Sequence, residues 1–463
     1  MIGSQVNEQE PAVVEMPAGG TDDWLPSEPA MGRARNLLRL ATAEIERRLA
    51  RVGLNMPGNL APWSAQFPVT AAELVVALAP FPAIILHLLG ATGTGKSSFV
   101  RLVQRAFAGD DFANLWCKAS ADDDIEHELV YDEHGMPRLA DSRFVTAKAL
   151  NLEELLRLIG EFQAIIKPLM CGAYGTQLVM ASSNPAGEAY RGHQLDRSIA
   201  AKCCVVPFDL ATPACSRVEV SRGAMAGLKD IGKAVSLIVD PETGAPVLDE
   251  LQASAPAIRQ VPLDREADIL LSALAMDRCM RAWGPLPEAE AIPLDVFEAL
   301  FISKPGRPAA ECPRDCPALT TCGRIGSLGV DHVAAIRNTA QALTLMKGAK
   351  VVDGGDRRER VSFASLKAIL PWYLTEDGAG LRCEGEVGHP EAIVSNWAEA
   401  VLACIRRFDA AFADVLKDLA DRPAPQLKQA EATAILGFMR SDYPSVALAC
   451  LRHAVDEKKG WGQ

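Results

Sequence analysis

The feature that most constrains this chain is a glycine-rich segment between an apolar run and a helical pattern. The segment is Gly90-Ala-Thr-Gly-Thr-Gly-Lys-Ser97, and the apolar run covers residues 83–89. Its glycines let backbone N–H groups point inward around phosphate oxygens, and the positive end of the following helix adds to the attraction. The lysine suits the terminal phosphates, and the serine hydroxyl suits Mg²⁺. The pattern therefore predicts a nucleoside triphosphate site.

We expect ATP to be held by consecutive residues of this segment, with Mg²⁺ on Ser97. The residues are Gly90, Ala91, Thr92, Gly93, Thr94, Gly95, Lys96, Ser97 and Ser98. The alternative is a glycine-rich turn without a ligand. That alternative does not explain why a strand pattern and a helix pattern flank the segment in the required order.

Composition and charge exclude several classes of protein. The 463 residues are 49% hydrophobic, which predicts two or three folded domains. The net charge of -12 disfavours a protein whose main task is binding nucleic acid. Residues 1–32 lack the apolar core of a secretory signal, and prolines interrupt the apolar stretch 74–89. We therefore expect a cytoplasmic protein with no membrane partner.

Strand patterns and helix patterns alternate after the loop, which predicts an α/β fold with a mainly parallel sheet. Strands are expected at 83–89, 115–118, 177–181 and 203–206, and helices at 96–107 and 151–166. Residues 130–139 are typical of a hairpin with its turn at 132–135, and residues 236–248 are a second hairpin candidate. Helical patterns dominate the chain after residue 330.

These patterns divide the chain into six expected parts. They are a disordered tail at 1–32, a helix and linker at 33–67, a nucleotide-binding core at 68–230, an insertion with a hairpin and a cysteine cluster at 231–328, a helical lid at 329–385, and a helical C-terminal region at 386–463.

Three further segments resemble the MoxR branch of the AAA+ ATPases. The strand pattern Val179-Met-Ala-Ser-Ser ends in Asn184-Pro185, and Leu195-Asp-Arg197 follows. Ser198 stands where the family has Phe. Residues 335–348 and 361–374 are similar to the two helices of the family's lid. The resemblance covers roughly residues 70–375.

The resemblance implies a P-loop AAA+ core followed by a helical lid, and an ATP hydrolase that acts as a chaperone. Asn184 would orient the attacking water, and Arg197 would reach the γ-phosphate in a neighbouring subunit. Arg324 and Arg337 are candidates for a second arginine from the lid. The family forms rings, such as hexamers, that remodel a client protein, often with a partner that carries a von Willebrand factor A domain.

The acidic motif that such an enzyme needs has two competing positions. Asp132-Glu133 has the required residue types, but it coincides with the turn of the expected hairpin. The segment 143–152 has the required place before a helix, but Lys148-Ala149 occupies the acidic positions. If the second alignment holds, the chain is a hydrolysis-deficient, ATP-binding scaffold subunit of a larger complex. Asn151 then caps the expected helix, with Glu154 three residues later.

A cysteine cluster stands apart from the family pattern. Cys312, Cys316 and Cys322 could ligate Zn²⁺ or an iron–sulfur cluster. A fourth ligand would be needed, with His332, Cys279 or Cys383 as candidates. The alternative is a set of free or partly buried thiols.

Overall fold

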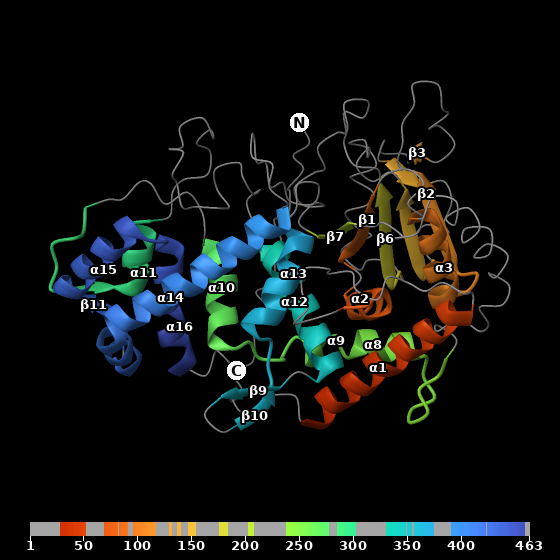
Figure 1. The fold of residues 1–463 in the computed structure, drawn as a ribbon, viewed down its shortest axis with the longest axis horizontal. Helices are drawn as coiled ribbons and strands as arrows, with labels where there is room; N and C mark the ends of the chain where they lie inside the picture. Colours follow the sequence, from red (N-terminus) through yellow and green to blue (C-terminus); the bar gives the residue numbers. More distant parts are fainter. Residues whose placement is uncertain are drawn as a thin grey trace, which may run out of the picture.

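The computed structural model divides into a sheet with covering helices at one end and a helical region at the other (Figure 1). The residues that it describes are 28–51, 69–81, 83–90, 96–116, 129–131, 137–139, 147–153, 176–183, 202–207, 238–276, 285–301, 330–348, 350–353, 356–374, 390–422 and 424–458. The fold is α/β, with a P-loop arrangement of strand, loop and helix, followed by a helical C-terminal region.

Five parallel strands form the sheet, in the order β2-β5-β6-β1-β7. They are β1 (Ile85–Leu89), β2 (Phe112–Trp116), β5 (Ala149–Glu153), β6 (Leu178–Ser183) and β7 (Cys203–Pro207). Every residue of β6 is buried, because parallel sheets are covered on both faces and their strands are apolar throughout. The expected parallel sheet is confirmed.

Helices α2 (Ala71–Leu78) and α3 (Lys96–Ala108) belong to the core on one face of the sheet. Leu86 and Leu88 of β1 join the same apolar cluster as Val103 and Phe107 of α3. Helix α2 begins with a capping box, in which the Thr70 hydroxyl accepts from the Glu73 N–H at 3.1 Å.

The helix expected from residue 151 is wrong at its start, because residues 149–153 form strand β5. This strand pairs with β2 on one side and β6 on the other. Pairing on both sides and complete burial of its apolar residues outweigh the local capping pattern of Asn151 and Glu154. The rest of the expected helix, 154–166, lies outside the described residues.

The first expected hairpin is confirmed, and the second is only partly so. Strands β3 (Leu129–Tyr131) and β4 (Pro137–Leu139) pair antiparallel. In the second segment, Gly244 adopts a φ of +70° in the turn and Val239 forms a single bridge with Pro246. The chain then enters α8 (Val247–Ala253), so no second strand forms.

Two helices and a short hairpin form the segment that resembles the lid. They are α12 (Val330–Lys347), α13 (Phe363–Tyr373), β9 (Lys350–Asp353) and β10 (Asp356–Glu359). Gly348 ends α12 with a φ of +65°, which a glycine adopts without strain. Ser362 caps α13 by accepting from the Ser365 N–H at 3.1 Å. The sequence pattern predicts both helix ends.

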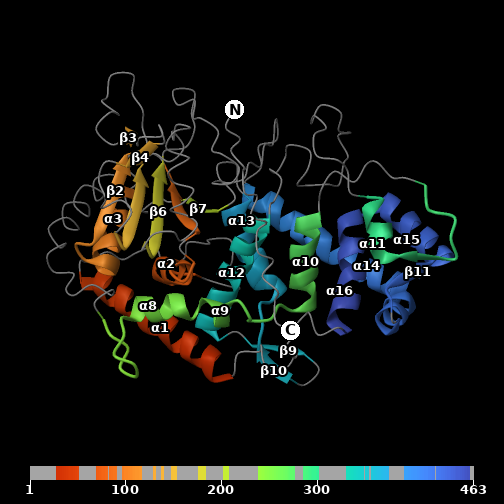
Figure 2. The ribbon, with the colours of Figure 1, turned by 180° about the vertical axis from the view of Figure 1, so that it is seen from behind.

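The helical region beyond this segment continues the same core. It contains α10 (Arg265–Met276), α11 (Leu294–Ala299), α14 (Pro390–Asp421), α15 (Gln429–Ser441), α16 (Pro444–Lys458) and the strand pair β8 (Ala291–Pro293) and β11 (Gln426–Lys428). Figures 1 and 2 both place α12 and α13 between the sheet and this region. Asp264 connects the first turn of α10 with the first turn of α13. Its carboxylate accepts from the Ala267 N–H at 2.7 Å and from the Phe363 N–H at 3.0 Å.

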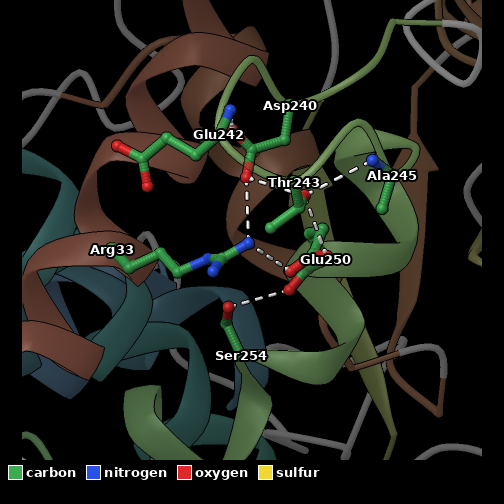
Figure 3. Close-up of polar contacts among 7 residues, drawn as sticks. All are labelled: Arg33, Asp240, Glu242, Thr243, Ala245, Glu250 and Ser254. Atoms are coloured by element: carbon green, nitrogen blue, oxygen red, sulfur yellow. Dashed lines mark hydrogen bonds and ion pairs between the residues drawn. The ribbon is translucent and has the colours of Figure 1, made fainter.

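Helix α1 (Glu28–Arg51) runs beneath the amino ends of the strands (Figure 1). Its Arg39 donates to the Met346 carbonyl at 2.7 Å, close to the end of α12. Its Arg33 reaches Asp240 at 2.9 Å and Glu250 at 2.8 Å, as Figure 3 shows. Helix α1 therefore ties the sheet domain to segments more than 200 residues away in sequence.

We predict that Arg33→Met lowers the free energy of unfolding by about 1–2 kcal/mol, because the change leaves a buried carboxylate without its guanidinium. The Asp240 side chain is only 7% exposed. Urea denaturation measures the change. The matched control is Arg47→Met on the same helix, where the partner is the neighbouring Glu44 and the arginine is 47% exposed. Arg47→Met should lower the free energy of unfolding by less than about 0.5 kcal/mol. Equal costs in both variants would show that α1 does not depend on the Arg33 contacts.

Candidate functional site

The glycine-rich segment lies between the end of β1 and the start of α3. Gly90 follows β1 directly, and Lys96 is the first residue of α3. The Lys96 side chain is buried, at 8% exposure, and its Nζ donates to the Gly90 carbonyl at 2.5 Å. Residues 91–95 lie outside the described part of the chain. The structure thus brings the two ends of the expected phosphate loop together.

The first turn of α3 is chemically suited to an anion. The helix is 13 residues long and has no acidic residue in its first turn. The first turn of a helix presents backbone N–H groups and the positive end of the helix dipole, and here no carboxylate of that turn competes with an anion. Ser97 is exposed in this turn, and Ser98 follows it in the helix.

The carboxyl end of β6 lies beside the start of the loop. Leu89 of β1 is level with Ser183 of β6, and the Gly90 N–H donates to the Ser183 carbonyl at 3.3 Å. Asn184 comes directly after Ser183 but lies outside the described residues. The expected position of Asn184 at a strand end next to the loop strand agrees with this register.

Strand β5, on the other side of β6, ends in Glu153, an acidic residue that the sequence patterns did not single out. Glu153 is the last residue of β5, level with Ser182, and Ser182 is level with Leu88. Glu154 follows in the sequence. Ligands of open α/β sheets bind at the carboxyl edge of the strands, so Glu153 ends at the same edge as Gly90 and Ser183. The strand pattern Ala149–Glu153 is the signal that could have revealed this position.

The alignment that placed Lys148-Ala149 at the acidic positions is wrong. Lys148 precedes β5 at the amino end of the sheet, opposite the loop. Its Nζ lies 3.9 Å from Asp249 Oδ1 on α8, and Gln177 donates to the same oxygen at 2.6 Å. Ala149 is buried in the apolar core. Lys148 is therefore an ion-paired residue at the far edge and does not occupy the acidic positions.

The rival acidic pair, Asp132-Glu133, falls between β3 and β4, outside the described residues. The hairpin expected around it is present, so its residues connect two antiparallel strands. In both overall views this hairpin lies above β2, the edge strand of the sheet (Figures 1 and 2). A catalytic role of Asp132-Glu133 stays a prediction.

A buried histidine lies next to the loop and was missed in the sequence. His87 of β1 is 0% exposed, and its Nε2 lies 3.0 Å from Ser183 Oγ. Burial lowers the pKa of this imidazole to about 4, because the cation loses its hydration. His87 is therefore neutral at physiological pH. A single histidine in an apolar run gave no periodic signal that could distinguish it from core.

Several other candidates lie outside the described residues: Arg197, Arg324, Cys279, Cys312, Cys316, Cys322 and Cys383. Arg337 is on α12, and its Nη2 lies 3.9 Å from Asp268 Oδ1 of α10. Figure 1 shows α10 on the side of α12 away from the sheet. His332 is buried with its Nε2 2.9 Å from the Tyr373 carbonyl oxygen, so that nitrogen is engaged within the core.

No group of three or more metal-ligating side chains occurs within the described part of the chain. Since the cysteine cluster lies outside that part, its metal stays a prediction. Among the described helices, none is long and apolar enough to span a bilayer.

Comparisons with known proteins give distant structural similarity only. No family model and no curated protein matches the chain. A solved structure of a candidate ATPase from Cytophaga hutchinsonii is 12% identical, with a TM-score of 0.45 over 80% of this chain and 97% of that chain. A full-length MCM homolog from Methanopyrus kandleri is 14% identical, with a TM-score of 0.32 over 76% of this chain and 63% of that chain. Similarity at this level transfers neither an activity nor a site to this chain.

We predict that His87 makes the stability of the protein depend on pH. The imidazole has a pKa of about 4 in the folded protein and an ordinary pKa of 6.5 when exposed to water, so the unfolded state binds more protons between these pH values. The free energy of unfolding therefore falls as the pH drops through this window. In His87→Leu, the loss between pH 7 and pH 5 should be smaller by about 2 kcal/mol. Urea unfolding at both pH values measures it.

The control for this experiment is Thr42→Val, which removes a buried hydroxyl from α1. It leaves His87 and His332 in place, the two described histidines whose pKa values are lowered by burial. This variant should keep the wild-type pH dependence. If His87→Leu keeps it as well, the histidine is not buried in its neutral form.

Proposed function

We propose that this chain is an ATP-hydrolysing P-loop protein of the AAA+ class, related to its MoxR branch. One observation carries the proposal. The carboxyl ends of β5, β6 and β1 are neighbours in the sheet, so Glu153, Ser183 and Gly90 end at one edge. Each of the three strands leads into a segment with the residue types that triphosphate hydrolysis needs.

The loop and α3 are suited to hold the nucleotide. The backbone of the glycine-rich loop would surround the phosphates, and Lys96 would exchange the Gly90 carbonyl for phosphate oxygens. The exposed Ser97 hydroxyl and the strand-end Glu153 carboxylate are the oxygen ligands that Mg²⁺ prefers, so these residues fit the ion. Mg²⁺ supplies neutralisation of charge on the β- and γ-phosphates when it is bound.

Glu154 is the proposed general base. It accepts a proton from water while the water oxygen bonds to the γ-phosphorus and the bond to the β–γ bridging oxygen breaks, which yields ADP and phosphate. Asn184 orients this water, and Arg197 of a neighbouring copy stabilises the charge that develops. The chain departs from the family at this position as well as at Ser198, because Glu153 stands where the family has Asp.

The rival proposal, a hydrolysis-deficient scaffold, has lost the observation that favoured it. That observation was Lys148-Ala149 at the acidic positions, and Lys148 pairs with Asp249 at the opposite edge of the sheet. Measured turnover decides between the two proposals.

The assembly and the client follow from the family resemblance. We infer a ring-shaped homo-oligomer, such as a hexamer, that remodels a client protein, with α12 and α13 as the lid over the nucleotide. A partner with a von Willebrand factor A domain belongs to the same inference. The proposed divisions of the chain remain the core at 68–230, the lid at 329–385 and the helical region at 386–463.

We predict that Lys96→Ala abolishes ATP binding, because the buried ammonium is the main positive charge at the loop. Glu154→Gln should bind ATP within about threefold of wild type and release phosphate at least about 100-fold more slowly, because the proton acceptor is lost. Phosphate release and equilibrium nucleotide binding measure the two effects.

The matched change at the rival acidic pair is Glu133→Gln, which should keep wild-type turnover. Loss of turnover in Glu133→Gln and not in Glu154→Gln would return the role of base to the hairpin. Tight ATP binding by the wild type without turnover, at every protein concentration, would support the scaffold instead.

We predict that Arg197 acts on the nucleotide of another copy. Arg197→Ala should bind ATP normally but release phosphate at least about 100-fold more slowly, since an arginine supplied in trans contributes about 10³–10⁵ in rate. Mixing Arg197→Ala with Lys96→Ala should restore part of the turnover, because a mixed interface pairs an intact loop with an intact arginine when the Arg197→Ala copy supplies the loop and the Lys96→Ala copy supplies the arginine. Absence of any restoration, in mixtures shown to co-assemble, would contradict a role in trans.

A further inference from the structure

Three successive contacts connect a buried histidine to the lysine of the loop. His87 Nε2 lies 3.0 Å from Ser183 Oγ, and the Ser183 carbonyl accepts from the Gly90 N–H at 3.3 Å. The Gly90 carbonyl accepts from Lys96 Nζ at 2.5 Å. We call these four residues the His87 relay. They join β1, β6 and α3 at the carboxyl edge of the sheet.

The middle residue of the relay has two separate attachments. The hydroxyl of Ser183 contacts His87, and its carbonyl holds the first residue of the loop. The next residue in the chain is Asn184, which the proposed function assigns to the attacking water. The position of Ser183 therefore affects both the loop and the water-orienting side chain.

Packing alone does not explain a histidine at position 87. Its neighbours along β1, Leu86 and Leu88, are buried and apolar, as expected for an interior parallel strand. Within the described part of the chain, His87 Nδ1 has no hydrogen-bond partner. A buried polar atom without a partner destabilises the folded state, so a leucine would fit this position at lower cost. Residues that lower stability in this way concentrate at functional sites.

We propose that His87 is a positioning residue of the phosphate site, which acts by fixing Ser183 and thereby the spacing between Gly90 and Asn184. This inference rests on the proposed hydrolysis of ATP. His87 does not contact the reacting atoms. A displacement of about 1 Å at a catalytic group can reduce a rate about 100-fold, so a small shift of Ser183 is sufficient for a large effect.

The test uses the full chain in four variants: His87→Leu, Ser183→Ala, the double variant, and Thr42→Val. The Thr42 hydroxyl is buried and donates to the Leu38 carbonyl at 2.8 Å on α1, at the other end of the sheet. Thr42→Val thus removes a buried hydrogen bond without touching the relay. Thermal unfolding, kcat and KM for ATP, and the dissociation constants of ATP and ADP are measured for each.

We expect kcat to fall at least about tenfold in His87→Leu, with KM for ATP changed less than about threefold. The double variant should lose no more activity than His87→Leu, because Ser183 acts in the same relay. Its unfolding midpoint should lie within about 3 °C of wild type, since the two side chains that contact each other are both replaced by apolar groups. Thr42→Val should turn over ATP like the wild type.

A double variant with wild-type kcat would overturn the inference. So would activity losses that follow the loss of stability across all variants, Thr42→Val included. If the wild type shows no turnover, the proposed hydrolysis is wrong. The dissociation constants of ATP and ADP then test the His87 relay independently of hydrolysis. Because ADP lacks the γ-phosphate, loss of the relay should then reduce the preference for ATP over ADP at least about fivefold. An unchanged preference would overturn the relay.

Discussion

The parallel pairing of β1 with β6 is the interaction on which the rest of the site depends. It sets Leu89 level with Ser183, residues that are far apart in the sequence. Because β6 also pairs with β5, the same register brings Glu153 to the edge where the loop begins. Parallel strands share one direction, so all their carboxyl ends meet at one edge. The pairing converts three separate sequence segments into one candidate site.

The arrangement of the sheet and the helical segments also depends on helix α1, which lies beneath the sheet. Helix α1 contacts α2 and α3 of the sheet domain, and its arginines reach Asp240, Glu250 and the end of α12. One continuous apolar cluster extends from α1 to α16. The lid-like segment is therefore joined to the core by side chains from the first described helix as well as by the chain connections.

The candidate site contains two buried polar residues. His87 lies within β1 and contacts the Ser183 hydroxyl, and Lys96 begins α3 and donates to the Gly90 carbonyl. Burial of such groups costs free energy, which the apolar core of the sheet offsets. A site of this kind tolerates few changes, because the surrounding β-strands fix the spacing of its members.

The sequence by itself predicted the parallel α/β core, the β3–β4 hairpin and a glycine-rich segment between a strand and a helix. These features depend on local patterns, namely glycine and lysine spacing, apolar periodicity and turn residues. The position of Glu153 at the carboxyl edge of the sheet was missed because Asn151 and Glu154 also fit a helix start. Only pairing with β2 and β6 makes residues 149–153 a strand. Likewise, nothing local distinguishes His87 from core, since its partner Ser183 is supplied by another strand. Tertiary structure decided both points because strand register is a property of pairs of segments, not of either segment alone.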